Sequence, residues 1–473
     1  MTEITKKTAL QALGLKQQSV SVTRRMAASL PNLRKVAESK GLKIHHLGAG
    51  YPHPDVTDPK GFLVHKQAYF DKLAAEEGLN DPDSTPEFLR EAFAYTDTLG
   101  PKLPRQLFAR VYGADWDIKI DPDQLIPTIG ASGGISLVCS LFERGEQKLA
   151  YLADAPTYAG FLARASLKQS SRIFSVDMDD EGPIPEQFVS QIHKARGEGY
   201  FLPFYYTVPD GHNPAGISFS DRRRREILDI ARAEQLLILE DAPYLYINYE
   251  KAGDRPTPFI ALDDKQTVHL FTGSKIGFPG PRVGFIYSNA QINIANDQTI
   301  AISSLLLTEA SADILFQNPE ALYGFAALLH DQNLEPRNSL WPVAESKMSV
   351  YTDNRAILLD TLKQELGAYR EHFLWTIPAA GFFSVFTFLN ETIRTDEDMV
   401  ANLVSDFGVV VVPMAEFYPA DAQERRPGVG LNQIRLSFCF TESAPGKRAD
   451  DMREAVLTFC AAAKKLSGIM ESE

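Results

Sequence analysis

The segment that decides the fold lies near the middle of the chain and reads Thr272-Gly273-Ser274-Lys275-Ile276-Gly277-Phe278-Pro279-Gly280-Pro281-Arg282. It separates two apolar runs, 268–271 and 283–287, which we expect to be buried strands. Lys275 and Arg282 therefore lie on a Gly/Pro-rich turn between strands, where proteins often place functional side chains. A lysine amine with a lowered pKa can form a Schiff base with an aldehyde, and the forked donors of arginine suit a phosphate.

The pattern Thr-x-Ser-Lys-x-x-x-Pro-Gly-x-Arg-x-Gly resembles the lysine motif of pyridoxal-phosphate-dependent aminotransferases of fold type I, class I/II. It is most similar to the branch that holds 2-aminoadipate, kynurenine and aromatic aminotransferases. The resemblance implies that this segment binds pyridoxal 5′-phosphate through Thr272, Ser274, Lys275 and Arg282. The chain departs from the family at Gly273, where an aromatic residue is usual, and at Pro281, where leucine is usual.

The residues before this segment predict a βαβ unit. A strand at 201–206, a helix capped by Ser220 and a buried strand at 236–239 follow one another at the spacing of a parallel sheet covered on both faces. Ligands of such sheets bind at the carboxyl ends of the strands. A carboxylate there can keep a pyridine nitrogen protonated, and amide or phenol donors can hold the ring oxygen. The resemblance implies these cofactor-binding roles for Asp241, Asn213 and Tyr244, and it makes Asp241 and Tyr244 catalytic together with Lys275.

A glycine-rich turn, Gly130-Ala131-Ser132-Gly133-Gly134, opens another expected helix. Backbone N–H groups and the helix dipole make such a turn an anion site. Its spacing matches neither a Walker A loop nor a Rossmann fingerprint, so nucleotide binding is disfavoured. The resemblance implies that Ala131 and Ser132 bind the cofactor phosphate and that Tyr158 stacks on the pyridine ring. Core packing is the alternative for Tyr158.

Arg435, in the apolar sequence Ile434-Arg435-Leu436-Ser437-Phe438, predicts a buried cation that needs an anion. A salt bridge to Asp or Glu is one possibility. The resemblance implies the other, in which Arg435 binds the α-carboxylate of the substrate beside Asn213. The loop that contains Gly50 and Tyr51 borders the substrate in the family, although an ordinary loop is equally compatible with its composition. The region 419–430 looks longer than is usual in the family.

Tyr95 and Gly100 form a Tyr-x-x-x-x-Gly pattern outside the βαβ unit. A surface tyrosine is the simplest interpretation. The pattern also resembles the family motif whose tyrosine reaches the cofactor phosphate of the other subunit. The resemblance therefore implies a homodimer with shared active sites.

The composition excludes several classes of protein. The chain has 473 residues, 44% of them hydrophobic and 23% charged, which predicts a globular protein with more than one core. A net charge of −13 argues against general affinity for nucleic acid or anionic membranes. The three cysteines are far apart, which predicts core thiols, no disulfide framework and no metal site. We expect no membrane helix, no secretory signal and a cytoplasmic protein.

Together these features predict an α/β fold of type I, with a mostly parallel seven-stranded sheet covered by helices and a smaller α+β domain. We expect an N-terminal arm and part of the small domain at 1–94, the large cofactor-binding domain at 95–340 and the C-terminal small domain at 341–473. Residues beyond 288 are expected to be helical as far as 329.

The predicted reaction moves the amino group of an L-amino acid, aromatic or similar to 2-aminoadipate, to a 2-oxo acid such as 2-oxoglutarate. Lys275 would move the proton between the substrate Cα and C4′ of the cofactor. A pyridoxal-phosphate-dependent lyase or decarboxylase on the same scaffold is the first alternative. A non-catalytic ligand sensor is the second, but residues 1–44 are too few for a winged-helix DNA-binding domain.

Overall fold

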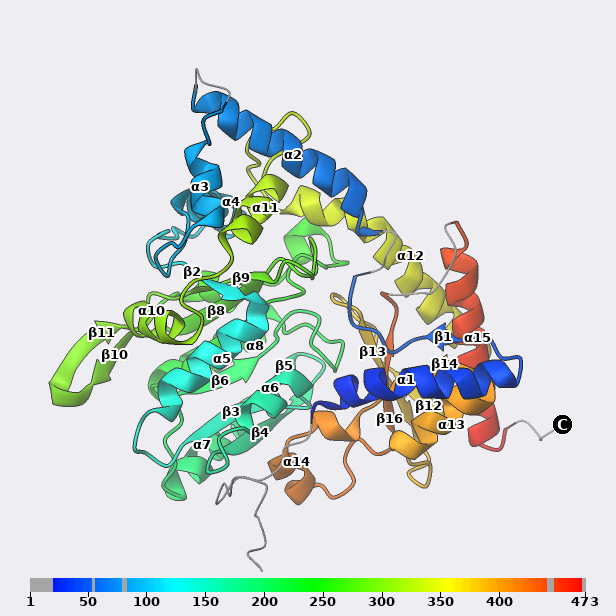
Figure 1. The fold of residues 1–473 in the computed structure, drawn as a ribbon. Helices are drawn as coiled ribbons and strands as arrows, with labels where there is room; N and C mark the ends of the chain where they lie inside the picture. Colours follow the sequence, from blue (N-terminus) through cyan, green and yellow to red (C-terminus); the bar gives the residue numbers. More distant parts are fainter. Residues whose placement is uncertain (1–19, 53–55, 79–82, 440–445, 470–473) are drawn as a thin grey trace, which may run out of the picture.

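The computed structural model of the chain describes residues 20–52, 56–78, 83–439 and 446–469. Figure 1 shows a large sheet with its covering helices on one side and a smaller α+β part on the other, joined along the long helix α12 (Trp341–Leu366). Apolar residues form separate clusters in the two parts. The active-site candidates therefore come from both sides of a boundary between two cores.

The large sheet has the strand order β2-β9-β8-β7-β6-β3-β4-β5. The strands from β8 to β4 run parallel, whereas β9 is antiparallel to both of its neighbours and β5 is antiparallel to β4. Their bounds are β2 (Ile126–Ile129), β3 (Ala150–Ala155), β4 (Arg172–Asp179), β5 (Gly182–Pro183), β6 (Phe204–Thr207), β7 (Leu237–Asp241), β8 (Thr267–Thr272) and β9 (Val283–Tyr287). The mostly parallel sheet is confirmed, but it has eight strands rather than seven, because the two-residue β5 pairs with the end of β4.

Both faces of this sheet are buried. Along β3, Tyr151 and Ala153 point to one apolar cluster, and Ala150 and Leu152 to the other, as the two-residue period of a strand requires. The first cluster includes residues of α4 (Lys102–Trp116), α5 (Gly130–Glu143), α6 (Ala159–Ala165), α10 (Ile302–Asp313) and α11 (Pro319–Leu328). The second includes residues of α7 (Pro185–Gly197), α8 (Asp221–Ala233) and α9 (Phe259–Leu262). The expected cap of α8 is present, since Ser220 accepts a hydrogen bond from the N–H of Arg223 at 3.1 Å.

The smaller part is built on an antiparallel sheet with the order β12-β13-β16-β15. These strands are β12 (Phe373–Trp375), β13 (Phe383–Phe388), β15 (Val412–Pro413) and β16 (Gln433–Ser437). The short strands β1 (His45–His46) and β14 (Val409–Val410) form a separate parallel pair. Helices α1 (Val22–Ser39), α13 (Glu397–Phe407) and α15 (Arg448–Leu466) contribute residues to its core. The N-terminal helix therefore packs with the C-terminal part of the chain, as Figure 1 shows.

The next two helices pack elsewhere. Tyr69 of α2 (Pro59–Glu76) belongs to the cluster of the large sheet, and Phe88 of α3 (Glu87–Phe93) packs against Tyr323 of α11. The proposed domain boundaries at 94 and 340 remain a prediction.

The expectation of continuous helix after residue 288 was wrong. A hairpin of β10 (Gln291–Ile294) and β11 (Gln298–Ala301) precedes α10 and projects from the large sheet (Figure 1). Residues in β10 alternate between exposed and half-buried, which is the two-residue period of a strand. Asp297 takes a left-handed conformation with φ of 55° in the turn, which a short polar side chain tolerates.

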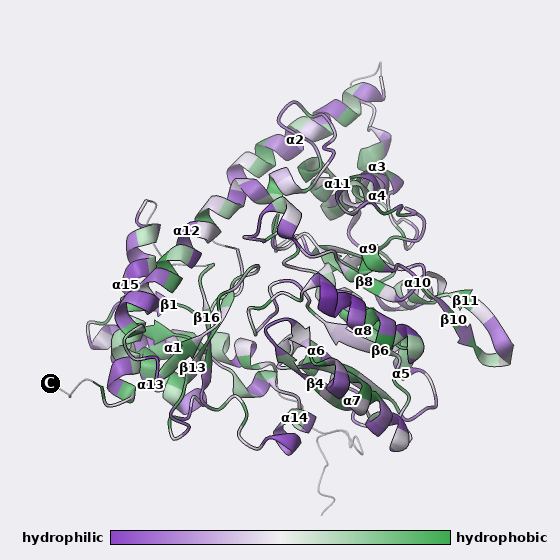
Figure 2. Cartoon of the chain, turned by 180° about the vertical axis from the view of Figure 1, so that it is seen from behind, coloured by the Kyte–Doolittle hydropathy of each residue, from purple (hydrophilic) through white to green (hydrophobic). Residues whose placement is uncertain are grey.

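Figure 2 shows polar and apolar residues interspersed along the long helices α2, α12 and α15. Within the described ranges, none of the helices has the length and apolar character needed to span a bilayer.

Candidate active site

Lys275 lies three residues beyond the end of β8, where the loops of the large sheet meet the small domain. Its Nζ donates a hydrogen bond to the carbonyl of Gly50 at 2.7 Å and lies 5.6 Å from the centre of the Tyr244 ring. Gly50 follows β1 and Tyr244 follows β7, so three distant segments meet at this amine. Burial lowers the pKa of Lys275 to about 8, and the nearby charges of Arg282 and Arg435 act in the same direction. A neutral amine is therefore accessible near neutral pH.

Asp241 is the last residue of β7 and is only 3% exposed. Its Oδ2 accepts a hydrogen bond from the hydroxyl of Tyr206 at 2.8 Å. Its buried Oδ1 has no hydrogen-bond partner among the residues that the structure describes. Burial raises the pKa of Asp241 to about 6. A buried oxygen without a donor leaves room for one more N–H group, such as that of a protonated pyridine.

The glycine-rich turn at the start of α5 faces Arg282. Gly130 has a φ of 64°, and a Cβ on it would lie only 2.6 Å from Nη2 of Arg282. Nη1 of Arg282 donates to Oγ of Ser274 at 3.2 Å, and the hydroxyl of Thr272 donates to the same oxygen at 3.0 Å. A guanidinium, two hydroxyls and the first N–H groups of a helix therefore converge, which is an arrangement suited to a phosphate.

Tyr158 connects this turn with the ring-binding region. The pKa of its hydroxyl is influenced by the side chain of Ser132 and by the charges of Asp241 and Arg282. Burial is the main cause that raises this pKa. Ala131 is half-buried and Ser132 is exposed in the first turn of α5. The structure thus brings the predicted ring-stacking residue and the predicted phosphate ligands together.

Arg435 is 3% exposed on β16 and approaches the site from the small domain. It donates from Nη1 to Oδ1 of Asn213 at 2.9 Å and from Nη2 to the carbonyl of Gly48 at 3.0 Å. Its guanidinium lies 4.2 Å from the centre of the Phe383 ring. Burial lowers the pKa of Arg435 to about 10, so the group stays charged at neutral pH. No Asp or Glu in the described ranges forms an ion pair with Arg435, and its Nε has no partner there.

The loop after β1 is closely packed at Gly50 and open at Tyr51. A Cβ on Gly50 would lie 3.0 Å from Cζ of Phe383 and 4.0 Å from Nη2 of Arg435. Tyr51 is 45% exposed. Sγ of Cys439 lies 3.1 Å from the carbonyl oxygens of both Ala49 and Tyr51, and either can accept a hydrogen bond from its single S–H. Cys439 is a buried core thiol, as predicted, and the structure also places it beside Lys275, whose pKa it influences. The strand period from Arg435 could have indicated this, because residues 435, 437 and 439 point to the same side.

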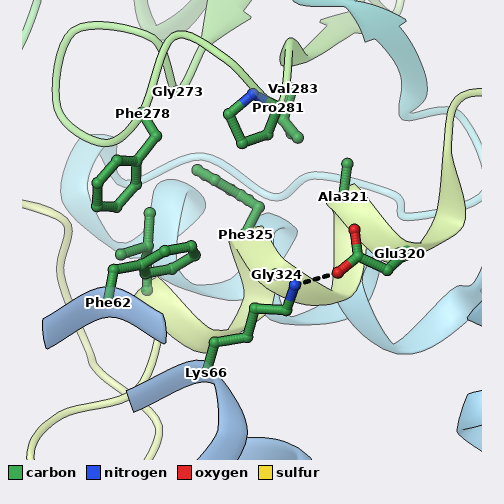
Figure 3. A pocket seen from close by; sticks show the side chains of 11 residues that line it. Phe62, Lys66, Gly273, Phe278, Pro281, Val283, Glu320, Ala321, Gly324 and Phe325 are labelled. Atoms are coloured by element: carbon green, nitrogen blue, oxygen red, sulfur yellow. Dashed lines mark hydrogen bonds and ion pairs between the residues drawn. The ribbon is translucent and has the colours of Figure 1, made fainter. Parts of the chain in front are cut away.

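The unusual glycine of the lysine motif has a local explanation. A Cβ on Gly273 would lie 2.8 Å from Cε2 of Phe325, so the ring of α11 occupies the space that a side chain would need. Phe325, Phe278 and Pro281 line a cavity of about 40 Å³ next to this loop, and Figure 3 shows their side chains around it. An ion pair between Lys66 and Glu320 lies at the cavity (Figure 3). Gly273 and Pro281, the two residues that depart from the family pattern, therefore line the same cavity.

Tyr95, a predicted cofactor-binding residue, lies outside the group of site residues that a single chain brings together around Lys275. It is 88% exposed, and its ring meets Phe316 edge-on at 5.8 Å between centres. Its expected contact with a second subunit stays a prediction.

A model of the family "Aminotransferase class I and II" matches residues 88–442. The chain belongs to the class I and II aminotransferases. It is 28% identical over 399 residues to (S)-3,5-dihydroxyphenylglycine transaminase of Amycolatopsis orientalis, and the match covers 83% of each chain. Over 169 residues it is 31% identical to the mitochondrial kynurenine/alpha-aminoadipate aminotransferase of Bos taurus, covering 34% of this chain and 39% of the relative.

The fold is shared with solved aminotransferases. The structure of Pyrococcus horikoshii kynurenine aminotransferase in complex with PMP superposes with a TM-score of 0.74, at 20% identity and 99% coverage of both chains. This aminotransferase uses pyridoxal 5′-phosphate and acts on amino acids. The residues fit the cofactor, because Oδ1 of Asp241, which has no partner in the described ranges, suits its ring nitrogen and the Gly130–Arg282 region suits its phosphate.

Proposed function

We propose that this aminotransferase moves the amino group of an L-amino acid with an aromatic or 2-aminoadipate-like side chain to a 2-oxo acid such as 2-oxoglutarate. The observation that carries the proposal is Arg435, a buried cation without a carboxylate partner among the described residues. A buried guanidinium needs an anion, and amino acids and 2-oxo acids share an α-carboxylate that suits its forked donors. The names of the relatives support the proposed side chain of the amino donor. Kynurenine and dihydroxyphenylglycine are aromatic, and aminoadipate carries a second carboxylate.

Each residue has a defined task in this proposal. The bound cofactor supplies an electron sink for the substrate. Lys275 Nζ removes the proton from the substrate Cα and returns a proton afterwards, which its lowered pKa favours. Asp241 keeps the ring nitrogen protonated, while Asn213 and Tyr244 hold the ring oxygen. Tyr158 stacks on the ring. The phosphate would be bound by Ala131, Ser132, Thr272, Ser274 and Arg282.

Gly50 and Tyr51 border the substrate in this proposal. The Gly50 carbonyl already contacts the Lys275 amine, and Gly50 packs against the Phe383 ring close to Arg435, the proposed ligand of the substrate carboxylate. Tyr51 is exposed at the mouth of the site.

The reaction itself can be tested with the loaded protein. Adding an amino donor without an acceptor is expected to convert the visible absorbance of the bound cofactor to that of its amine form, and a 2-oxo acid is expected to reverse the change. A panel of aromatic and dicarboxylic amino acids identifies the donor. Release of ammonia or carbon dioxide without an acceptor would instead indicate a lyase or a decarboxylase.

Arg24 is the candidate for binding the second carboxylate of a dicarboxylic substrate. It is exposed in the first turn of α1 and has no side-chain hydrogen bond or ion pair among the described residues. Burial raises the pKa of the Tyr158 hydroxyl, and the nearby charge of Arg24 opposes that rise. A cation in the first turn of a helix is unfavourable, because the helix dipole is positive there. Arg24 is therefore available to an anion at the mouth of the site.

We predict that Arg24→Gln raises the KM for 2-oxoglutarate and for 2-aminoadipate by up to about tenfold, because one charge-assisted contact in a partly solvated place is lost. The KM for an aromatic donor should change little. Steady-state kinetics with both donor classes measure the difference. Lys35→Gln removes an exposed charge from the same helix and serves as the matched control. Equal effects on both donor classes would contradict this role for Arg24.

We further propose a homodimer with shared sites. Phe93 and Tyr95 are 77% and 88% exposed and lie two residues apart, which leaves two aromatic rings uncovered on a single chain. Large exposed rings in one place are typical of a protein interface. Tyr95 of one subunit would reach the phosphate of the cofactor that is held by Lys275 and Arg282 of the other subunit.

A mixed dimer tests the shared arrangement. One chain carries Tyr95→Ala and the other carries Lys275→Ala, each with a different affinity tag. In a shared arrangement one site has both substitutions and the other has neither, so activity should return to as much as half of the wild-type value per dimer. If each chain forms its own site, every site carries one substitution, and activity stays at the average of the two mutant homodimers. That result would reject the shared site.

We propose that the enzyme acts in the cytoplasm. Its cysteines, Cys139, Cys439 and Cys460, are all buried and free, which fits a reducing compartment.

A further inference from the structure

Several contacts join the small domain to the large one, and one of them is a short segment that packs against β4 of the large sheet. Residues 415–425, which we call the clasp, comprise the turn η4 (Ala415–Phe417) and helix α14 (Ala420–Arg425). Figures 1 and 2 both show α14 beside β4, away from the rest of the small domain. The clasp begins two residues after β15 and includes part of the region that looks longer than usual in the family.

Asp421 fastens the far end of the clasp. It is 1% exposed, and its Oδ2 accepts hydrogen bonds from the N–H of Ser175 at 3.1 Å, from its hydroxyl at 2.9 Å and from Gln191 at 3.1 Å. Lys194 binds its Oδ1 at 3.0 Å, and Arg425 contacts Oδ2 at 3.2 Å. Burial would raise the pKa of Asp421, but Lys194 and Ser175 hold it below its usual value. The carboxylate is therefore charged and almost fully surrounded by donors.

Arg425 adds a second attachment to the same strand. Its guanidinium forms hydrogen bonds with both carboxylate oxygens of Asp177 at 3.0 and 3.2 Å and with the carbonyl and hydroxyl of Ser175 at 3.0 Å each. Paired contacts of this kind fix orientation as well as distance. The two attachments hold α14 in one place against β4.

The near end of the clasp lies between two parts of the active site. The N–H of Thr157, the neighbour of Tyr158, donates to the carbonyl of Phe417 at 2.8 Å. The Phe417 ring is fully buried, and its centre lies 5.3 Å from the guanidinium of Arg435. One backbone bond and one ring therefore connect the loop that carries Tyr158 with the arginine of the small domain.

We propose that the clasp sets the separation between Arg435 and Tyr158, and that Asp421 is a positioning residue for substrate binding. This inference rests on the proposed role of Arg435. The substrate carboxylate is bound from the small domain, whereas Lys275 and Tyr158 belong to the large one. The distance across this boundary decides whether one substrate can contact Arg435 and the Lys275 region at the same time, so a change in this distance is expected to weaken the binding of both substrates.

Asp421→Asn keeps the shape of the side chain but removes the charge that Lys194 and Arg425 surround. We expect the KM for both the amino acid and the 2-oxo acid to rise about tenfold. Binding of pyridoxal phosphate, measured by absorbance, should be unchanged. Hydrogen exchange at the Thr157 amide should become faster, because its bond to Phe417 opens more often.

Glu424→Gln is the matched control. Glu424 lies on the same helix and pairs with Arg172 of the same strand, but it is 62% exposed, so its loss should leave KM and Thr157 exchange unchanged. Arg425→Lys is the second test variant, and it should show a smaller effect in the same direction because it keeps the charge. If the Asp421→Asn protein does not fold, Arg425→Lys tests the proposal in its place.

A lower melting temperature with unchanged KM values and unchanged Thr157 exchange would overturn the proposal, because the clasp would then be purely structural. Faster exchange with unchanged KM values would also overturn it, since the clasp would not position the substrate. Arg435→Lys separates this failure from that of the proposed function. If carboxylate inhibitors bind equally well to Arg435→Lys and to the wild type, the role of Arg435 is wrong, whatever the clasp does.

Discussion

Lys275→Ala is expected to abolish the visible absorbance of the lysine-bound cofactor and to reduce turnover by roughly 10²- to 10⁴-fold or more, the range that one acid–base group contributes. The reason is that the Lys275 amine is the group placed at the Gly50 carbonyl and near the Tyr244 ring, with a pKa lowered to about 8. Alanine offers neither the nucleophile nor the base. Absorbance spectra and single-turnover kinetics of the purified variant check both effects.

Lys347 provides the matched control. It is a buried lysine, it lies 5.8 Å from the Phe278 ring of the same loop, and burial lowers its pKa as well. Lys347→Ala should therefore keep the absorbance band that Lys275→Ala loses. A Lys275→Ala chain that retains the band would show that another amine holds the cofactor.

Asp241→Asn is expected to slow proton removal by roughly 10²- to 10³-fold, in the range found when one preorganised electrostatic contact is lost. The carboxylate is buried and its Oδ2 is bound by Tyr206, whereas its Oδ1 has no hydrogen-bond partner in the described part of the chain and so suits a protonated ring nitrogen. A neutral amide has the same size but cannot stabilise the positive charge on that nitrogen. Folding and cofactor binding should persist, and stopped-flow single-turnover rates measure the loss.

The neighbouring carboxylate distinguishes this role from a general effect of charge. Glu240 is also fully buried, but it accepts hydrogen bonds from the N–H of Phe259 at 2.7 Å and contacts Nδ1 of His269 at 2.7 Å, and so already has its partners. Glu240→Gln should lower the melting temperature more than it lowers the single-turnover rate. Unchanged single-turnover rates in Asp241→Asn would rule out its proposed contact with the ring nitrogen.

Much of the large domain was predictable from local patterns. The strands on both sides of Lys275 and the helix capped by Ser220 were expected within a few residues of their observed bounds. Their signals are short-range, because a buried strand reads as an apolar run and a cap as one polar residue before a helix. The hairpin at 291–301 was missed, since its alternation spans only four residues on each side. The eighth strand was missed for a similar reason, because two residues carry no period.

The sequence by itself determined which side chains stand at the ends of strands and turns, since Lys275, Asp241 and Asn213 each follow a recognisable element and lie in the order of a known motif. Only the tertiary structure decided what meets them there. Cys439 contacts the loop at residues 49–51, which faces Lys275, and Asp421 contacts Ser175 of β4. In both cases more than 200 residues of chain separate the partners. Such contacts depend on how the two hydrophobic cores pack against each other. A strand period can indicate the side to which Cys439 points, but not the segment that it meets there.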